Sequence, residues 1–270
     1  MRRGIAYWRL KDIKNAALDF DRAVELEPKF ALGYVERGEV KAHNGDLKEA
    51  LVDFNIAVKL DPKSPIVYSS RSYAEEETGD YKGALEDLNK ELELDPKGTF
   101  AYLSRGDLKW KTGDYKGALA DLDKGISLNP KISMAYEDRA GVKREMKDYT
   151  GALADFSKAT ELDPKISGYY NNLGDAKIRL GDYKGALKDC ETAIKLDPKE
   201  CHAYGTMGEA ENGLKDYAAA IRDFNKSMEL DPKGGDGEIY YGRATAELSL
   251  GDRKSALEDF KKAKDRGYNR

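Results

Sequence analysis

Two cysteines and two histidines are the side chains of this 270-residue sequence best suited to act as nucleophiles, general bases or metal ligands. Cys190 and Cys201 are too few for a disulfide framework, and we expect no bridge between them. His43 and His202 lie far apart in the chain, so we expect no zinc site shared between them. We therefore predict no metal and no cofactor, and we expect Cys190 to be a buried, inert thiol.

Two short motifs resemble functional sites but have the wrong surroundings. The run 234–237 (Gly-Gly-Asp-Gly) is not followed by Lys-Ser/Thr or preceded by a strand pattern, which excludes a phosphate-binding loop. We expect a linker there that accommodates an insertion of Gly235 and Asp236. The sequon at 225–227 (Asn-Lys-Ser) falls within an expected helix, and we predict that it is not glycosylated. No nucleophile–base pair or carboxylate dyad stands out, so we predict no catalytic residue and no enzymatic activity.

Composition and charge exclude further classes of protein. The 46 basic and 50 acidic residues give a net charge of −4, too evenly mixed for a basic face that binds nucleic acid. The mean hydropathy is −0.73, and no apolar run approaches the ~18 residues that a membrane span needs. The first residues lack the apolar core of a leader peptide, so a cytoplasmic location is the default expectation.

The spacing of the prolines shows how the chain is organised. Apart from Pro65, each proline lies 34 residues after the last, at positions 28, 62, 96, 130, 164, 198 and 232. A fixed period of this length indicates an array of repeats. Numbered so that this proline is position 32, the repeats cover about 1–30 (incomplete), 31–64, 65–98, 99–132, 133–166, 167–200, 201–234 and 237–270. We expect them to form a single domain over 1–270.

Several positions keep their residue type in every repeat. Position 20 is alanine: Ala16, Ala50, Ala84, Ala118, Ala152, Ala186, Ala220 and Ala256. Position 4 is tyrosine wherever it is present: Tyr34, Tyr68, Tyr102, Tyr136, Tyr170, Tyr204 and Tyr240. Position 8 is small and position 24 is mostly Phe or Leu. Small residues at 8 and 20 allow two backbones to approach closely, while the larger side chains fill the space beside them.

These positions predict two short antiparallel helices in each repeat. Position 16 is aspartate throughout and usually follows a glycine, which is typical of a helix C-cap followed by an N-cap. The step into the proline at position 32 ends the second helix. Aspartates also recur at position 23, where we expect solvated helix faces with nearby lysines rather than a calcium or catalytic site.

This pattern of residues resembles the tetratricopeptide repeat family over essentially the whole chain. The family has an aromatic residue at 4, small residues at 8 and 27, alanine at 20, an aromatic residue at 24 and proline at 32. The resemblance implies an all-α, right-handed superhelical solenoid of about eight helix pairs, the first incomplete, with the first helix of each pair lining a concave groove. Arginine replaces the more usual aliphatic residue at position 7 in most repeats, among them those of Arg37, Arg71, Arg105, Arg139 and Arg243.

In this family, positions 2, 5, 9 and 12 of the first helix face the groove, and these positions vary here from repeat to repeat. They include both tryptophans. Exposed aromatic residues grouped in this way often mark a binding surface, although they can also pack against adjacent repeats. The candidate partner-binding residues on this stripe are Trp8, Glu39, Tyr73, Glu76, Phe100, Leu103, Asp107, Trp110, Glu137, Asn171, Asp175 and Glu209.

The stripe is mostly acidic, so we expect a protein or peptide partner that is basic or mixed basic and apolar. The carboxylate clamp of chaperone adaptors in this family is disfavoured, because its best window offers Asp107 and Asp138 where a cation or amide is needed. Our primary hypothesis is a non-enzymatic scaffold that binds a peptide or helix of its partner in the groove.

Three alternatives stay open. The chain could be a regulatory or targeting module of a larger enzyme or of a secretion or assembly factor, because Met1 falls at position 5, inside a first helix. That shortened helix could also leave an open N-terminal face for self-association. RNA binding is opposed by the negative stripe, because contacts to phosphates need Lys or Arg.

Overall fold

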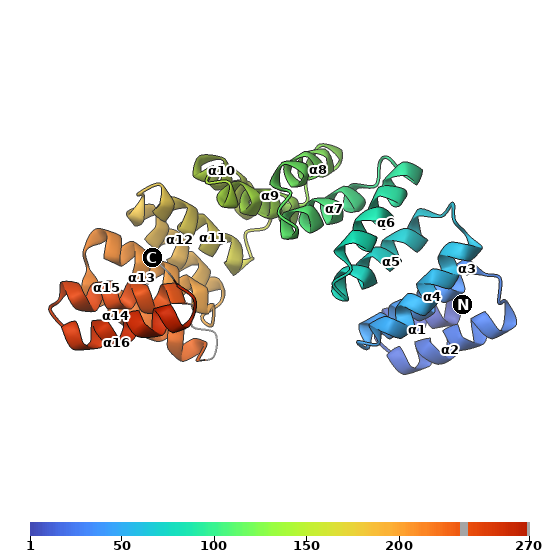
Figure 1. Cartoon of the computed structure of the whole chain (residues 1–270), viewed down its shortest axis with the longest axis horizontal. Helices are drawn as coiled ribbons and strands as arrows, with labels where there is room; N and C mark the ends of the chain where they lie inside the picture. Colours follow the sequence, from blue (N-terminus) through green and yellow to red (C-terminus); the bar gives the residue numbers. More distant parts are fainter. Residues whose placement is uncertain (233–236, 269–270) are drawn as a thin grey trace. The chain divides into compact units, whose positions relative to one another are not determined.

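The computed structural model describes residues 1–232 and 237–268, and these residues form sixteen α-helices and no strand (Figure 1). The chain divides into two compact units, Met1–Pro130 (unit 1) and Lys131–Arg270 (unit 2). The linker expected at 234–236 lies outside the described residues. Within the described part of the chain, every helix is too short or too polar to cross a membrane.

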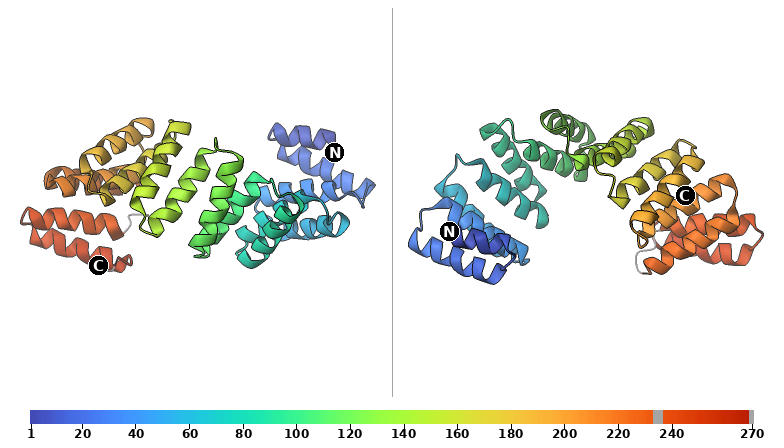
Figure 2. Two further views of the ribbon diagram at one scale, coloured as in Figure 1. Left: turned by 90° about the horizontal axis from the view of Figure 1, so that it is seen from above. Right: turned by 180° about the vertical axis from the view of Figure 1, so that it is seen from behind.

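Each unit contains four pairs of helices, and the two helices of a pair lie antiparallel, side by side (Figure 2). Unit 1 consists of α1 (Arg2–Arg9), α2 (Ile13–Leu26), α3 (Ala31–His43), α4 (Leu47–Leu60), α5 (Pro65–Glu77), α6 (Tyr81–Leu94), α7 (Thr99–Lys111) and α8 (Tyr115–Leu128). Unit 2 consists of α9 (Ser133–Glu145), α10 (Tyr149–Leu162), α11 (Ser167–Arg179), α12 (Tyr183–Leu196), α13 (Cys201–Leu214), α14 (Tyr217–Leu230), α15 (Gly237–Ser249) and α16 (Arg253–Asp265).

We call the first helix of a pair its A helix and the second its B helix. The pairs confirm the predicted all-α helical repeat fold, while a single continuous domain over 1–270 stays a prediction.

The turn inside each pair follows from the capping residues. The residue before the position-16 aspartate has a positive φ in every repeat. It is a glycine in five repeats, such as Gly45 (φ 87°), and a lysine in the other three, at Lys11, Lys147 and Lys215. The aspartate side chain then accepts a hydrogen bond from the third backbone N–H of the B helix, as Asp80 does from Gly83. This confirms the predicted caps except at Asp46, whose side chain accepts no such bond.

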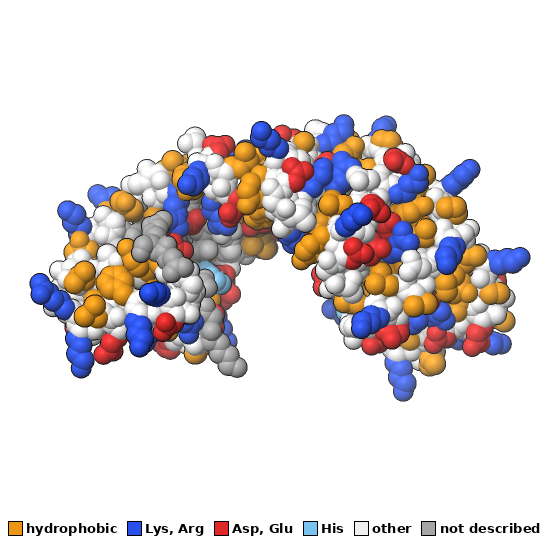
Figure 3. All heavy atoms as spheres, viewed as in Figure 1, with side chains coloured by type: hydrophobic (Ala, Val, Ile, Leu, Met, Phe, Trp, Pro, Cys, Tyr) orange, Lys and Arg blue, Asp and Glu red, His pale blue; other side chains and the backbone are white. Residues whose placement is uncertain are grey.

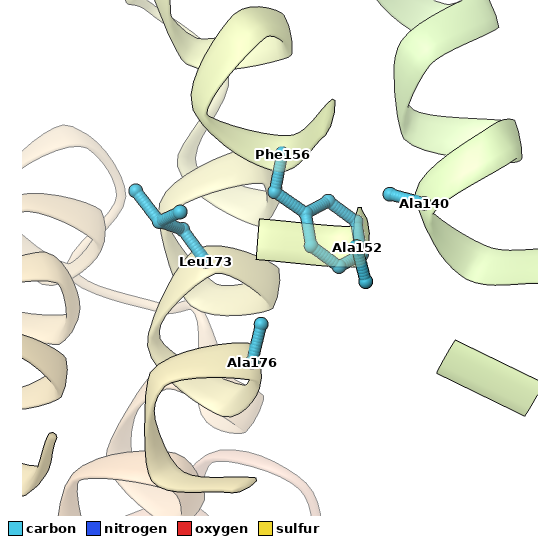
Figure 4. Close-up of a cluster of buried hydrophobic side chains, with 5 residues drawn as sticks. All are labelled: Ala140, Ala152, Phe156, Leu173 and Ala176. Atoms are coloured by element: carbon cyan, nitrogen blue, oxygen red, sulfur yellow. The ribbon is translucent and has the colours of Figure 1, made fainter. Parts of the chain in front are cut away.

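Within a pair, the position-24 side chain packs over the small residue at position 8. A Cβ atom added to Gly38 would lie 2.5 Å from Cε1 of Phe54, so glycine leaves the room that this ring needs. The same side chains join one pair to the next. In unit 2, Phe156 of α10 belongs to a buried cluster with Ala140 of α9 and Leu173 of α11 (Figure 4).

Five of the position-23 aspartates are buried, namely Asp53, Asp87, Asp121, Asp155 and Asp259, so the expectation of solvated helix faces is wrong for these five. Asp53 has 0% of its surface exposed. Its carboxylate accepts hydrogen bonds from Arg37 Nε at 2.9 Å, Arg37 Nη2 at 2.6 Å and Lys41 Nζ at 2.7 Å. The arginines at position 7 therefore neutralise an aspartate of their own repeat. The other pairs of this kind are Arg3–Asp19, Arg71–Asp87, Arg105–Asp121, Arg139–Asp155 and Arg243–Asp259.

Two repeats lack an arginine at position 7 and differ from each other. In the first, position 7 is Leu173, and Lys177 at position 11 supplies the positive charge instead. Its Nζ lies 2.6 Å from the Asp189 carboxylate. In the next repeat, position 11 is Glu211, which is 8% exposed and has an Oε2 atom without a hydrogen-bond partner. Burial, together with contact with the Asp223 carboxyl, raises the pKa of Glu211 to about 8.

The buried ion pair predicts that Asp53→Ala lowers the free energy of unfolding by about 2–4 kcal/mol, because Arg37 and Lys41 lose their partner inside the pair. Asp21→Ala is the matched control, since the Asp21 side chain is 55% exposed and 3.4 Å from Arg37. It should change stability by less than about 0.5 kcal/mol. Urea denaturation measures both variants, and equal losses would contradict the assignment.

The raised pKa of Glu211 predicts a stability that depends on pH. The native state holds the proton more tightly than the unfolded chain, so stability is complete below about pH 4 and declines as pH rises towards 8. Glu211→Gln removes this titration, so the loss of stability between pH 5 and 9 should be smaller by more than about 1 kcal/mol. The exposed Glu191→Gln on α12 is the control. Thermal melts from pH 5 to 9 test this, and parallel curves for all three proteins would exclude it.

Candidate functional site

The A helices of unit 1 enclose a largely apolar depression of about 490 Å³. Trp8 of α1, Ile66 and Tyr73 of α5 and His43 of α3 form its walls, and Glu39 of α3 lies among them. The Trp8 and His43 rings meet edge to face, with their centroids 5.2 Å apart. Three of the residues predicted from the stripe, Trp8, Glu39 and Tyr73, are thus brought together in one place.

Glu39 is the acidic group of this depression. Its Oε1 accepts a hydrogen bond from Ser70 Oγ of α5 at 3.2 Å. Burial raises the pKa of Glu39, and the bond from Ser70 only partly opposes that rise. A cationic group next to Glu39 would offset the cost of desolvating its charged form, so this carboxyl is suited to receive one.

The next predicted residues along unit 1 behave differently. Lys111 Nζ lies 2.6 Å from Glu76 and 2.7 Å from Asp107, so these two acids already share a cation. Phe100 is 68% exposed, and Trp110 is partly exposed. Leu103 is only 3% exposed and packs at Gly125, so it serves the core and cannot offer a partner much surface.

The A helices of unit 2 surround a polar depression of about 550 Å³. The predicted residues Asn171, Asp175 and Glu209 line it. Arg179 Nη2 lies 3.2 Å from both Asp175 and Glu238, and Arg144 lies 3.6 Å from Asp175. The remaining predicted residue, Glu137, accepts a hydrogen bond from Asn172 at 3.1 Å.

These cations make the A-helix faces less negative than the stripe suggests, and Figure 3 shows basic, acidic and hydrophobic side chains intermixed on the face that it draws. Lys111, Arg179 and His43 occupy position 13, and Ser70 occupies position 6. Both positions follow from the stripe by helical spacing, because 6 is four residues after 2 and 13 is four after 9. Extending the stripe to them would have found these residues.

The cysteines have the states that the sequence predicts. Both thiols are free. Cys190 is fully buried at position 24, and burial raises its pKa to about 12, which makes it a poor nucleophile.

Three family models, each of the tetratricopeptide repeat, match the chain. Their matches cover residues 1–65 and 103–166, residues 169–200, and residues 202–233. No curated protein matches the sequence significantly.

Several solved structures are similar to this chain. A tetratricopeptide repeat protein from Parabacteroides merdae is 20% identical, with a TM-score of 0.67 over 95% of this chain and 96% of that one. MamA is 23% identical, with a TM-score of 0.57 over 63% of this chain and 92% of that one. YrrB, described as a TPR protein with an unusual peptide-binding site, is 23% identical, with a TM-score of 0.53 over 68% of this chain and 93% of that one. At these identities the similarity shows the fold alone.

Proposed function

Because this chain belongs to the tetratricopeptide repeat family, we propose that it is a non-enzymatic scaffold that binds a peptide or helix of a protein partner on its A-helix faces. Repeats of this family are generally protein–protein interaction modules. The partner-binding residues are those of the two depressions, with Phe100 of unit 1 as a further exposed anchor.

The observation that carries this proposal is the combination of apolar walls and one partly buried carboxyl, that of Glu39, in unit 1. Trp8, Ile66 and Tyr73 offer an apolar side chain a place to leave water, which supplies most of the binding free energy at such sites. The Glu39 carboxyl accepts a hydrogen bond from a neutral donor, the Ser70 hydroxyl. A lysine or arginine of the partner would complete the charge pair. The ligand is therefore an apolar or aromatic side chain close to a basic one.

The depression of unit 2 favours a different segment of the partner. Asp175, Glu238, Arg144 and Arg179 present both signs of charge, and Asn171 adds an amide. Fixed charges of both signs discriminate between partners more than they add affinity. We assign this surface a role in specificity and the unit 1 depression a role in anchoring.

The proposal predicts which variants lose binding. Fluorescence anisotropy with labelled peptides that place a Trp or Leu beside a Lys or Arg identifies the best ligand. Glu39→Gln should raise its Kd by about tenfold, because the charge pair is lost in a partly desolvated place. Tyr73→Ala should do so by a similar factor, because the anchor loses its wall.

Two control variants make matched changes on B helices. Glu49→Gln removes an exposed carboxylate from α4, and Tyr81→Ala removes an exposed ring from α6. Neither should change the Kd. A ligand that responds equally to both sets of variants, or that prefers Glu over Lys beside its anchor, would contradict the proposal.

A further inference from the structure

Three different donor groups converge at the start of α13. Glu200 is the N-cap of this helix and makes no capping hydrogen bond with its side chain, and Cys201 and His202 are the first two helical residues. His202 Nδ1 lies 3.3 Å from Glu200 Oε1 and 3.6 Å from Cys201 Sγ. Within residues 1–232 and 237–268, this is the one group of three His, Cys, Asp or Glu side chains whose donor atoms lie so close together.

The distances from His202 Nδ1 to Glu200 Oε1 and to Cys201 Sγ match those between the ligands of a tetrahedral zinc ion. Zinc bonds of about 2.3 Å to sulfur and about 2.0–2.2 Å to nitrogen and oxygen place S and N ligands about 3.6 Å apart, and N and O ligands about 3.4 Å apart. All three donor atoms lie within 4.8 Å of one another, so rotation of the side chains can bring them onto one ion.

Hydrogen bonding alone does not satisfy this arrangement well. Nδ1 of a neutral His202 carries either a proton or a lone pair, but not both. With a lone pair, Nδ1 can accept a hydrogen bond from the Cys201 thiol but repels the Glu200 carboxylate. With a proton, it donates to Glu200 and offers Cys201 no acceptor, so either tautomer satisfies only one of the two contacts. A divalent cation instead accepts a lone pair from all three groups, with the thiol bound as thiolate.

The neighbouring helix pair supports the carboxylate, and the surface leaves room for an ion to enter. Ser167, the first residue of α11, donates a hydrogen bond from Oγ to Glu200 Oε2 at 3.3 Å. Such outer contacts orient a ligating carboxylate and strengthen metal binding. The His202 side chain is 65% exposed, so solvent reaches the group from one side.

We propose that Glu200, Cys201 and His202 bind a zinc ion through Oε1, Sγ and Nδ1. A thiolate, an imidazole and a carboxylate form a borderline-soft set that suits Zn²⁺ and not Mg²⁺ or Ca²⁺. Three protein ligands leave a fourth position for water or for a side chain of a bound partner. His202 also lines the polar depression of unit 2, so the ion lies at the edge of that surface. The metal site does not depend on the proposed peptide binding.

Titration of the reduced, metal-free full chain with Co²⁺ tests the proposal, because cobalt reports its ligands by absorption. One equivalent should produce a thiolate-to-cobalt charge-transfer band in the near ultraviolet together with the visible bands of tetrahedral cobalt, and Zn²⁺ should remove both. Cys201→Ser should abolish the charge-transfer band. His202→Ala should weaken binding by at least about tenfold.

Glu191→Ala is the control, because it removes an exposed carboxylate from α12, outside the donor group, and should leave the affinity unchanged. His202 is also exposed, so its replacement leaves the fold intact, which circular dichroism checks. Absence of the charge-transfer band in the unmodified protein would overturn the proposal. So would a band that persists in Cys201→Ser, or an affinity that His202→Ala leaves unchanged. No peptide takes part, so failure here is distinct from failure of the proposed function.

Discussion

The close approach of the two helices in each pair is the constraint on which the rest of the structure depends. Phe54 occupies the space that a side chain on Gly38 would need, and Phe224 lies 3.0 Å from the place of a Cβ on Gly208. A dense interior of this kind fixes which face of each A helix is turned inward. The stripe beside that face makes fewer core contacts, and its residues Trp8, Glu39 and Tyr73 line the unit 1 depression.

Charge is arranged around the same contact. Each buried aspartate at position 23 belongs to a B helix and is met by a cation from the A helix of its own pair, as Asp121 is by Arg105 and Lys109. Burial alone would raise the pKa of Asp121, yet these two partners lower it. The pair α13–α14 departs from this rule, because Glu211 faces Asp223 there. The donor group of Glu200, Cys201 and His202 lies at the start of the same helix, α13. This helix therefore differs from the other A helices near both of its ends.

The sequence predicts the helix pairs, their caps and the buried Cys190, because these depend on local spacing and on the conformational preferences of Gly, Asp and Pro. It does not predict that Asp53 is buried, because that depends on how far Arg37 and Lys41 reach across the pair. For the same reason it overstates the negative charge of the A-helix faces, since Lys111 turns back onto Asp107 and Glu76. Leu103 shares a stripe with exposed residues but is drawn inward by the space at Gly125. A periodic pattern gives the direction of a side chain, whereas its reach and its neighbours follow only from the packed structure.

A double-mutant cycle on positions 8 and 24 of one repeat tests the central constraint most directly. Gly38→Ser and Phe54→Leu are made singly and together, which reproduces the residues that Ser72 and Leu88 supply in the following repeat. The free energy of unfolding of the double variant should exceed the value expected from adding the single changes by about 1 kcal/mol, because the smaller side chain makes room for the serine. Effects that simply add would show that the two residues do not compete for the same space, and would contradict the account.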